Sequence, residues 1–225
     1  MTQSYFVTGT DTEVGKTAVA CALLEAANQC GLKTAAIKPV AAGCDDQGRN
    51  DDALQLQQAM SVAMPYEQVN PVALQAAIAP HIAAAREGRT LQVSRLAGLC
   101  RGVMLGGADM VLIEGAGGWR VPLGPRETLA DLAKELRVGV ILVVGMRLGC
   151  INHALLTAEA IARDGLHLAG WVANQPGERM KSHEENLDTL LRLMPAPLLG
   201  EVPVLTPFSA TRAAEYIDIK ALEEK

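Results

Sequence analysis

The sequence predicts an α/β fold built on a doubly wound, mostly parallel sheet with helices on both faces. Short apolar runs, rich in β-branched residues, alternate along the chain with segments of helical spacing. The runs are nearly continuous in apolar residues, as strands buried on both faces are. A chain of 225 residues is long enough to bury one good-sized core, so we expect a single domain over residues 1–225.

The expected elements can be placed in chain order. Candidate strands are residues 5–8, 34–38, 110–114, 138–144, 168–174 and 198–202, and candidate helices are residues 16–30, 51–60, 91–104, 129–136, 152–163 and 184–193. Gly31 stands where the first helix needs a left-handed residue to end. The polar segments 41–50 and 173–181 should be mobile loops beyond the carboxyl ends of the strands, where ligands of such folds bind.

Composition and charge narrow the classes of partner. The net charge of −5 comes from acidic and basic residues mixed along the chain, without the basic or basic-aromatic stretches that bind nucleic acid. We see neither a secretory signal nor an apolar stretch of roughly eighteen residues, so we expect a cytoplasmic protein with no membrane partner. The odd cysteine count indicates free thiols at Cys21, Cys30, Cys44, Cys100 and Cys150.

The strongest local motif is GTDTEVGKT, residues 9–17, between a predicted strand and a predicted helix. There, backbone N–H groups and the helix dipole hold an anionic phosphate. Lys16 would reach the β- and γ-phosphates of a nucleotide, and the Thr17 hydroxyl would bind Mg²⁺. Five residues separate Gly9 from Gly15, one more than in the standard P-loop. The sequence therefore predicts a P-loop NTPase type of fold with a variant loop.

A P-loop enzyme also needs a carboxylate near the metal, usually at the end of a second apolar strand. Glu114 stands there, in ADMVLIEGAGG. The glycines that follow would let the backbone pass close to a ligand, whereas the alternative is a glycine turn with a solvated glutamate. Beside a P-loop, the metal-side role is favoured.

Two further charged residues have open interpretations. Lys38 ends an apolar strand and precedes Pro39, which keeps the lysine extended. Its side chain is either a cation in the ligand crevice or an ordinary solvated lysine. Asp52 either joins the metal shell or caps a helix.

The later part of the chain offers two more candidates. The strand at 138–144 leads to a helix expected to begin near Asn152, whose start either binds a carboxylate or is simply capped by Gly149 and Cys150. That position would lower the thiol pKa of Cys150. Asn174 either bonds an adenine edge through its amide or forms a turn.

Several motifs together point to a family. They are GTDTEVGKT, IKPVAAG, VLIEGAGGW, LGCINHALLT, GWVAN and PAPLLGEVP, and they span residues 5 to about 203. With them the chain resembles the bacterial dethiobiotin synthetases, in which the longer P-loop spacing is the usual pattern. The resemblance implies a Mg²⁺- and ATP-dependent ligase that forms a carbamate from CO₂ and 7,8-diaminononanoate, phosphorylates it and closes a ureido ring, releasing ADP and phosphate. It also implies a homodimer with the substrate site near the interface.

The resemblance assigns roles to individual residues. Lys38 matches the family's catalytic lysine, and Lys16 is the second cation that would stabilise the charge of the carbamate-phosphate anhydride. The magnesium ligands are matched by Thr17, Asp52 and Glu114. The ATP contacts are matched by Glu13, Val14, Gly15, Lys16, Thr17, Ala18, Asp52, Glu114, Gly115, Ala116, Gly117, Asn174, Gln175, Pro203, Val204 and Leu205. The substrate contacts are matched by Thr12, Lys38, Ala42, Gly149, Cys150, Ile151 and Asn152.

Two positions depart from the family pattern. Ala42 stands where a serine contacts the substrate, and losing such a neutral hydrogen bond typically costs about 0.5–1.5 kcal/mol. Asn186 stands where a tyrosine reaches the substrate of the partner subunit. Both changes would act on substrate binding rather than on the chemistry.

Three other functions compete with this interpretation. A partitioning or positioning ATPase of the same P-loop class would carry a signature lysine where this chain has Asp11, and would need a membrane-binding helix. A related ATP-dependent amide synthase would need a glutaminase domain or partner. A binding module that keeps its nucleotide as a structural ligand would not need Lys38.

Overall fold

The computed structural model describes residues 2–222 and confirms the predicted α/β fold. One six-stranded sheet has the order β2-β5-β1-β6-β7-β8, and every neighbouring pair in it is parallel. Its strands are β1 (Gln3–Gly9), β2 (Thr34–Ile37), β5 (Met110–Glu114), β6 (Gly139–Gly145), β7 (Leu168–Asn174) and β8 (Leu198–Val202). Parallel pairing with apolar residues on both faces is what the near-continuous apolar runs predict.

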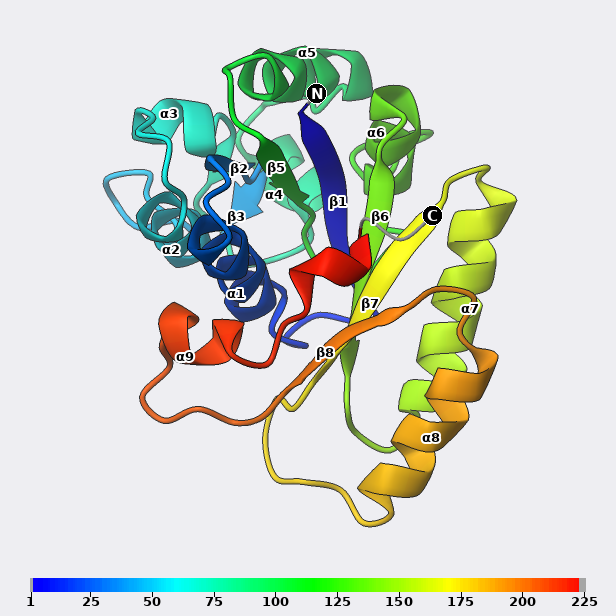
Figure 1. Cartoon of the computed structure of the whole chain (residues 1–225). Coiled ribbons are helices and arrows are strands. Elements are labelled where there is room, and N and C mark those ends of the chain that lie inside the picture. Colours follow the sequence, from blue (N-terminus) through cyan, green and yellow to red (C-terminus); the bar gives the residue numbers. More distant parts are fainter. Residues whose placement is uncertain (1, 223–225) are drawn as a thin grey trace.

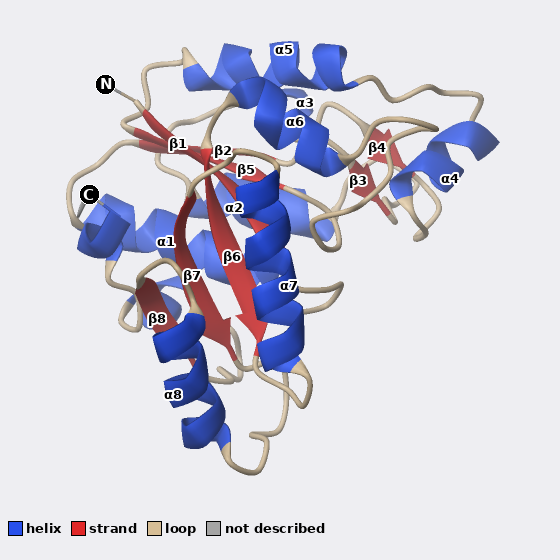
Figure 2. Cartoon of the chain, turned by 90° about the vertical axis from the view of Figure 1, so that its right-hand side faces the viewer, coloured by secondary structure: helices blue, strands red, loops and turns tan. Residues whose placement is uncertain are grey.

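Helices cover both faces of this sheet (Figures 1 and 2). One hydrophobic core lies between the sheet and α1 (Lys16–Gln29), α2 (Asp51–Ala59), α3 (Tyr66–Val69), α9 (Ala210–Ala214) and the 3₁₀ turn η1 (Ile219–Leu222). The other core lies between the opposite face and α4 (Pro80–Arg86), α5 (Val93–Met104), α6 (Leu129–Leu136), α7 (Cys150–Arg163) and α8 (His183–Leu193). The sheet is therefore doubly wound.

The structure differs from the sequence-based expectation in its short strands and in the ends of some longer elements. Segment 41–50, expected as a loop, begins with strand β3 (Ala41–Ala42), which pairs in parallel with β4 (Ala73–Leu74) in a second, small sheet. This sheet and α4 project from one side of the molecule (Figure 2). Segment 173–181 begins inside β7, and α7 starts at Cys150, two residues before the expected start.

The strand order places the site-forming loops together. The central strand β1 lies between β5 and β6, so the loops that follow these three strands leave the sheet side by side at the carboxyl edge. The loop after β7 joins them, because the pairing of β7 with β6 continues to the ends of both strands at Asn174 and Gly145. Ligands of open parallel sheets bind at this edge.

The C-terminal chain covers the outer edge of β8. Gly200 forms an antiparallel bridge with Ile217, and the backbone N–H of Asp218 donates to the carbonyl of Leu199 at 2.7 Å. A side chain on Gly200 would collide with the carbonyl of Tyr216, so this close approach requires glycine. The segment after α9 thereby pairs with an edge strand that would otherwise be open.

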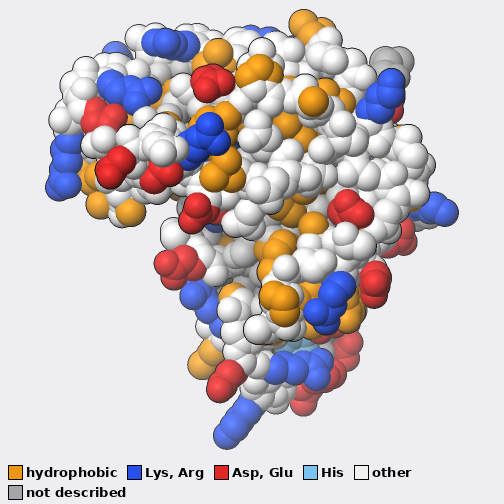
Figure 3. Space-filling view, turned by 90° about the vertical axis from the view of Figure 1, so that its left-hand side faces the viewer, with side chains coloured by type: hydrophobic (Ala, Val, Ile, Leu, Met, Phe, Trp, Pro, Cys, Tyr) orange, Lys and Arg blue, Asp and Glu red, His pale blue; other side chains and the backbone are white. Residues whose placement is uncertain are grey.

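On the face shown in Figure 3, basic and acidic side chains are interspersed with apolar and uncharged ones. Among residues 2–222, none of the helices has the length and apolar character needed to cross a bilayer.

Candidate active site

The P-loop joins the end of β1 to the start of α1. Gly15 precedes the helix in the left-handed conformation, with φ 83° and ψ 34°, and Glu13 also has a positive φ of 59°. Only glycine adopts such a conformation at little cost, so Gly15 lets the chain curl tightly into the helix. A side chain on Gly9 would meet Val14 at 2.6 Å, which shows how closely the loop folds back on itself.

Lys16 lies within this loop and is largely buried. Its Nζ donates to the backbone carbonyl of Asp11 at 3.2 Å. Burial lowers the pKa of Lys16, and the nearby Glu114 carboxylate only partly opposes this shift. A phosphate group beside the ammonium would favour its charged form, as the P-loop role requires.

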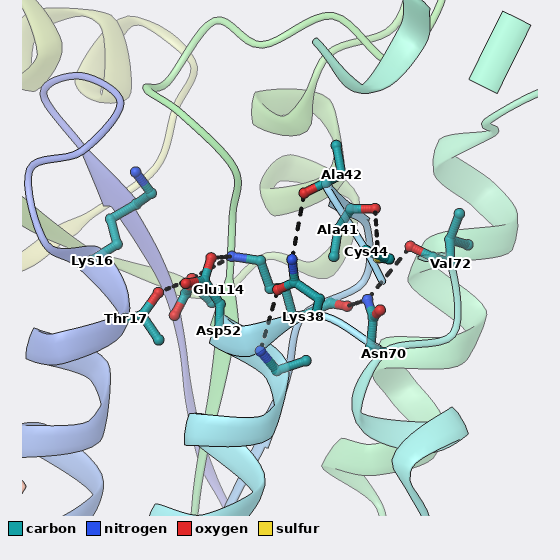
Figure 4. Close-up of polar contacts among 12 residues, drawn as sticks. Lys16, Thr17, Lys38, Ala41, Ala42, Cys44, Asp52, Asn70, Val72 and Glu114 are labelled. Carbon is teal, nitrogen blue, oxygen red and sulfur yellow. Dashed lines mark hydrogen bonds and ion pairs between the residues drawn. The ribbon is translucent and has the colours of Figure 1, made fainter. Parts of the chain in front are cut away.

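Four side chains meet beside the P-loop, three from α1, α2 and β5 and one from the residue that follows β2 (Figure 4). Glu114, at the end of β5, is fully buried, and its Oε1 accepts a hydrogen bond from the Thr17 hydroxyl at 2.9 Å. The same oxygen lies 2.5 Å from Nζ of Lys38. Lys38 Nζ also lies 2.7 Å from Oδ2 of Asp52, in the first turn of α2. Lys16 stands apart, with its ammonium pointing away from this cluster.

The charges in this cluster set each other's ionisation. Burial alone would lower the pKa of Lys38, but the carboxylates of Glu114 and Asp52 outweigh it, and the net result is a raised pKa. Burial likewise would raise the pKa of Asp52, but the Lys38 ammonium lowers it overall. Lys38 is therefore a buried, permanently charged ammonium near neutral pH.

The residues present fit a magnesium ion. Glu114 Oε2 is a buried carboxylate oxygen with no hydrogen-bond partner among the described residues, which is the state expected of an oxygen reserved for a cation. Thr17 and Asp52 add a hydroxyl and a second carboxylate on either side. Mg²⁺ in nucleotide enzymes is held by one or two such carboxylates together with phosphate oxygens.

Lys38 is held at the backbone as well as at the side chain. Its N–H donates to the carbonyl of Val69 at 2.7 Å, and its carbonyl accepts from Asn70 Nδ2 at 2.8 Å. Asn50, rather than Asp52, caps the start of α2 through its side chain, so the helix-cap alternative for Asp52 is wrong. Asp52 is thereby left to face Lys38.

The predicted nucleotide residues lie around the P-loop in three groups. Val14 lies in the loop and Ala18 in the first turn of α1, while Gly115, Ala116 and Gly117 follow Glu114. An added Cβ at Gly117 would lie 3.5 Å from the hydroxyl of Thr12, so these two loops are in contact range. Asn174, at the end of β7, is buried and donates from Nδ2 to the carbonyl of Val14 at 2.8 Å.

The third group lines a pocket of about 650 Å³ beyond β7 and β8. Three predicted nucleotide contacts line it, namely Gln175, Pro203 and Val204, and Leu205 follows them in the chain. The amide nitrogen of Gln175 donates to the carbonyls of Gly177 and Glu178, which fixes the wall of the pocket. Its volume suits a small ligand group.

The remaining substrate candidates lie at the start of α7 and in β3. Gly149, with φ 95°, precedes α7, and Ile151 and Asn152 lie in its first turn. Cys150 is buried, and burial raises the pKa of its thiol, so the lowered pKa expected at a helix start is wrong. Ala42 ends β3 and lies four residues after Lys38 in the chain. Among residues 2–222, no hydrogen bond or ion pair joins Thr12, Ala42 and the start of α7 to one another.

Sequence reasoning missed several residues that build the site. Arg147 pairs with Asp11 at 2.5 Å and so ties the loop before α7 to the P-loop. Asn70 holds the carbonyl of Lys38, and Glu201 lines the pocket while its Oε1 lies 2.7 Å from Nε2 of the buried His183. The opposite charges of Asp11 and Arg147 were visible in the sequence, but their pairing was not, because 136 residues separate them.

Comparison of the sequence with known proteins identifies the family of this chain. A family model described as an AAA domain matches residues 3–212. An ATP-dependent dethiobiotin synthetase BioD from Cellvibrio japonicus is 59% identical over 223 residues, which covers 98% of this chain and 97% of that protein. The protein of the same name from Pseudomonas aeruginosa strain UCBPP-PA14 is 55% identical, with 97% of each chain covered. This chain belongs to the dethiobiotin synthetase family.

The similarity extends to a dethiobiotin synthetase BioD 1 from Salmonella typhi, which is 51% identical with 99% of each chain covered. Members of the dethiobiotin synthetase family are ATP-dependent ligases, and this chain is one of them.

Solved structures with low sequence identity share the fold of this dethiobiotin synthetase family member. The MinD cell division protein of Aquifex aeolicus has a TM-score of 0.60 at 15% identity, over 98% of this chain and 95% of that chain. A ParA family ATPase from Chlorobium tepidum TLS has a TM-score of 0.59 at 12% identity, with 98% of each chain covered. These likenesses show the P-loop fold alone.

Proposed function

We propose that this chain closes the ureido ring of dethiobiotin from 7,8-diaminononanoate, CO₂ and ATP. One amine adds to CO₂ and loses a proton, which gives a carbamate. A carbamate oxygen then takes the γ-phosphoryl group of ATP, and ADP leaves. The second amine attacks the carbonyl carbon of this anhydride and loses a proton, the bond from that carbon to the phosphate oxygen breaks, and the ring closes as phosphate leaves.

The observation that carries the proposal is the buried ammonium of Lys38 beside the P-loop. Its raised pKa keeps it protonated near neutral pH, so it acts as a fixed positive charge and not as a general base. Negative charge builds up where the carbamate meets the γ-phosphate, between the elements that carry Lys16 and Lys38. Two positioned cations in a water-poor site stabilise such charge strongly.

Thr17, Asp52 and Glu114 are the residues that would hold Mg²⁺. The support is the buried, unpartnered Oε2 of Glu114 and the converging hydroxyl and carboxylate groups around it. When bound, the ion would neutralise charge on the phosphate oxygens of ATP. Glu114 itself is held rigidly by its complete burial at the end of β5.

The ATP molecule would extend from the P-loop to the pocket beyond β7 and β8. Backbone N–H groups between Glu13 and Ala18 would bind the phosphates, as the start of α1 favours anions. Pro203 and Val204 offer apolar surface for the base, and Gln175 and Glu201 offer polar groups at its rim. Asn174 would support the site indirectly, since its amide nitrogen is already bonded to Val14.

We also propose a cytoplasmic homodimer in which the start of α7 lies near the interface. Leu148 and Leu156 support this, because their side chains are 91% and 56% exposed and flank the substrate residues Gly149–Asn152. Large apolar side chains exposed beside a proposed site are a feature of surfaces that bind a protein partner. Sedimentation equilibrium at micromolar concentration should give twice the chain mass, and a single species of monomer mass would contradict the dimer.

The activity is tested by measuring phosphate release from ATP with Mg²⁺ and bicarbonate, with and without 7,8-diaminononanoate, while the product is followed by mass. Release that requires the diamine and yields the ureido compound supports the proposal. Equal ATP hydrolysis without the diamine, with no ureido product, would instead favour a P-loop ATPase of the partitioning or positioning type.

A further inference from the structure

Lys38 is bound to the very groups proposed to hold magnesium. Its ammonium lies 2.5 Å from Oε1 of Glu114 and 2.7 Å from Oδ2 of Asp52 (Figure 4). Oε1 of Glu114 also accepts the Thr17 hydroxyl. The ammonium therefore lies among the three proposed metal ligands.

Two cations at this place would repel each other. Glu114 is fully buried and the Lys38 side chain is only 5% exposed, so water screens their charges poorly. A buried carboxylate without a cation is strongly unfavourable, which explains why an ammonium lies there. A divalent ion on the same carboxylates would meet the positive charge of Lys38 within a few ångströms.

The backbone of Lys38 is held by hydrogen bonds, whereas its side chain can rotate. Backbone hydrogen bonds to Val69 and Asn70 fix its Cα position. Four flexible carbons then carry the ammonium, which rotates about several single bonds. In Figure 4, Ala41 and Ala42 lie on the side of Lys38 opposite to Lys16. Ala42 is a proposed substrate contact, so the proposed substrate site adjoins the lysine.

We propose that Lys38 is the resident counter-ion of the metal site and exchanges with Mg²⁺. In the metal-free protein it neutralises Glu114 and Asp52; when Mg²⁺ binds with nucleotide, Lys38 releases both carboxylates and turns toward the carbamate. This inference rests on the proposed function, because it takes the metal-ligand assignment from there. It adds an order of events, in which the metal and nucleotide bind before Lys38 becomes available to the substrate.

The competing arrangement is coexistence, in which the metal uses the free Oε2 of Glu114 while Lys38 keeps Oε1. The two differ in the state of the ammonium. A buried, ion-paired ammonium exchanges its protons slowly enough to be seen by ¹H–¹⁵N NMR of ¹⁵N-labelled lysine, whereas a released ammonium in water loses that signal.

The decisive experiment records this signal in the wild-type protein, with assignment by its absence in Lys38→Met. Exchange predicts that the signal is present without metal and disappears on addition of Mg²⁺ with the β,γ-imido analogue of ATP. The analogue without Mg²⁺, in the presence of a chelator, should leave the signal in place. A signal that persists with both Mg²⁺ and analogue bound overturns the exchange.

A second measurement uses thermal unfolding during titration with MgCl₂ alone. Lys38→Met should unfold at a lower temperature than wild type without metal, and its Mg²⁺ dissociation constant should be lower by about tenfold or more, because no ammonium has to be displaced. The matched control is Lys134→Met, which removes an exposed lysine paired with Asp131 and should match wild type. Equal Mg²⁺ affinity in wild type and Lys38→Met would contradict the exchange.

The variant Glu114→Gln separates a wrong metal assignment from a wrong exchange. If Mg²⁺ stabilises the wild type but not Glu114→Gln, the metal assignment stands, and the NMR signal and the Mg²⁺ affinity of Lys38→Met decide the exchange. If Mg²⁺, with or without the ATP analogue, stabilises neither protein, the metal assignment itself is wrong and the exchange falls with it.

Discussion

Asn174, at the end of β7, donates a 2.8 Å hydrogen bond to the carbonyl of Val14 in the P-loop. The bond joins residues 160 positions apart and holds the loop against the sheet. It leaves so little room at the neighbouring Gly15 that an added Cβ would collide with the amide of Asn174. The shape of the P-loop thus depends on a strand formed much later in the chain.

Gly15→Ala should therefore abolish tight nucleotide binding while the fold survives. Alanine at φ 83° is strained by roughly 1–2 kcal/mol, and its methyl group would displace Asn174. ATP titration calorimetry should show binding weakened at least tenfold, with a native circular dichroism spectrum. The control is Gly98→Ala in α5, which has open space around it and should gain about 0.5–1 kcal/mol of stability. Unchanged affinity in Gly15→Ala would show that the loop tolerates the methyl group.

Glu114→Gln should destabilise the protein by about 3 kcal/mol, because it leaves the buried Lys38 ammonium with Asp52 as its remaining partner. Urea unfolding measures the change. Glu135→Gln is the matched control: its pair with Arg101 is 48% exposed on both sides, and such pairs contribute about 0–1 kcal/mol. Similar costs for the two variants would mean that the buried pair adds nothing to stability.

Val204→Trp should weaken ATP binding by filling the pocket beyond β7 and β8, since Val204 lines it. We expect the dissociation constant for ATP to rise by about tenfold or more, equivalent to about 1.4 kcal/mol. Leu105→Trp, at an 86% exposed position after α5, is the control and should bind ATP as the wild type does. If both variants bind ATP normally, the base lies elsewhere.

Cys100 should make stability fall at alkaline pH. Burial raises the pKa of its thiol from 9.0 to about 12, so between these values the unfolded chain loses a proton that the folded chain keeps. The free energy of unfolding should fall with pH more steeply in wild type than in Cys100→Ala, by up to about 1.4 kcal/mol per pH unit. Cys30→Ala, which removes an exposed thiol, should follow the wild type. Parallel slopes in all three proteins would contradict this assignment.

The sequence predicts the main architecture because its signals are local. Strands Met110–Glu114, Leu168–Asn174 and Leu198–Val202 and helix Leu129–Leu136 have the predicted ends, since continuous apolar runs and helical periodicity mark them directly. Glu114 and Lys38 could be nominated because each follows a recognisable strand at the edge where ligands bind. Their roles in catalysis and metal binding remain predictions that the variants above address.

Other parts carry no local signal. Two-residue strands such as β3 and β4 are too short for any periodicity, and they form only because the chain brings Ala41 beside Ala73. The contact of Lys38 with Asn70 likewise depends on how a loop returns to the sheet. Helix α4 begins with Pro80, and a proline at the first helical position is compatible with turns as well as helices.

The pairing of Ile217 with Gly200 has a consequence for how these molecules behave in concentrated solution. A bare edge strand is a template on which the strand of another molecule can add, and chains that meet in this way aggregate. Here the chain's own C-terminal segment already uses the hydrogen-bonding groups of β8 around Leu199 and Gly200. The segment around Ile217 therefore protects this edge of the sheet from such addition, although it lies far along the chain from the motifs that carry the chemistry.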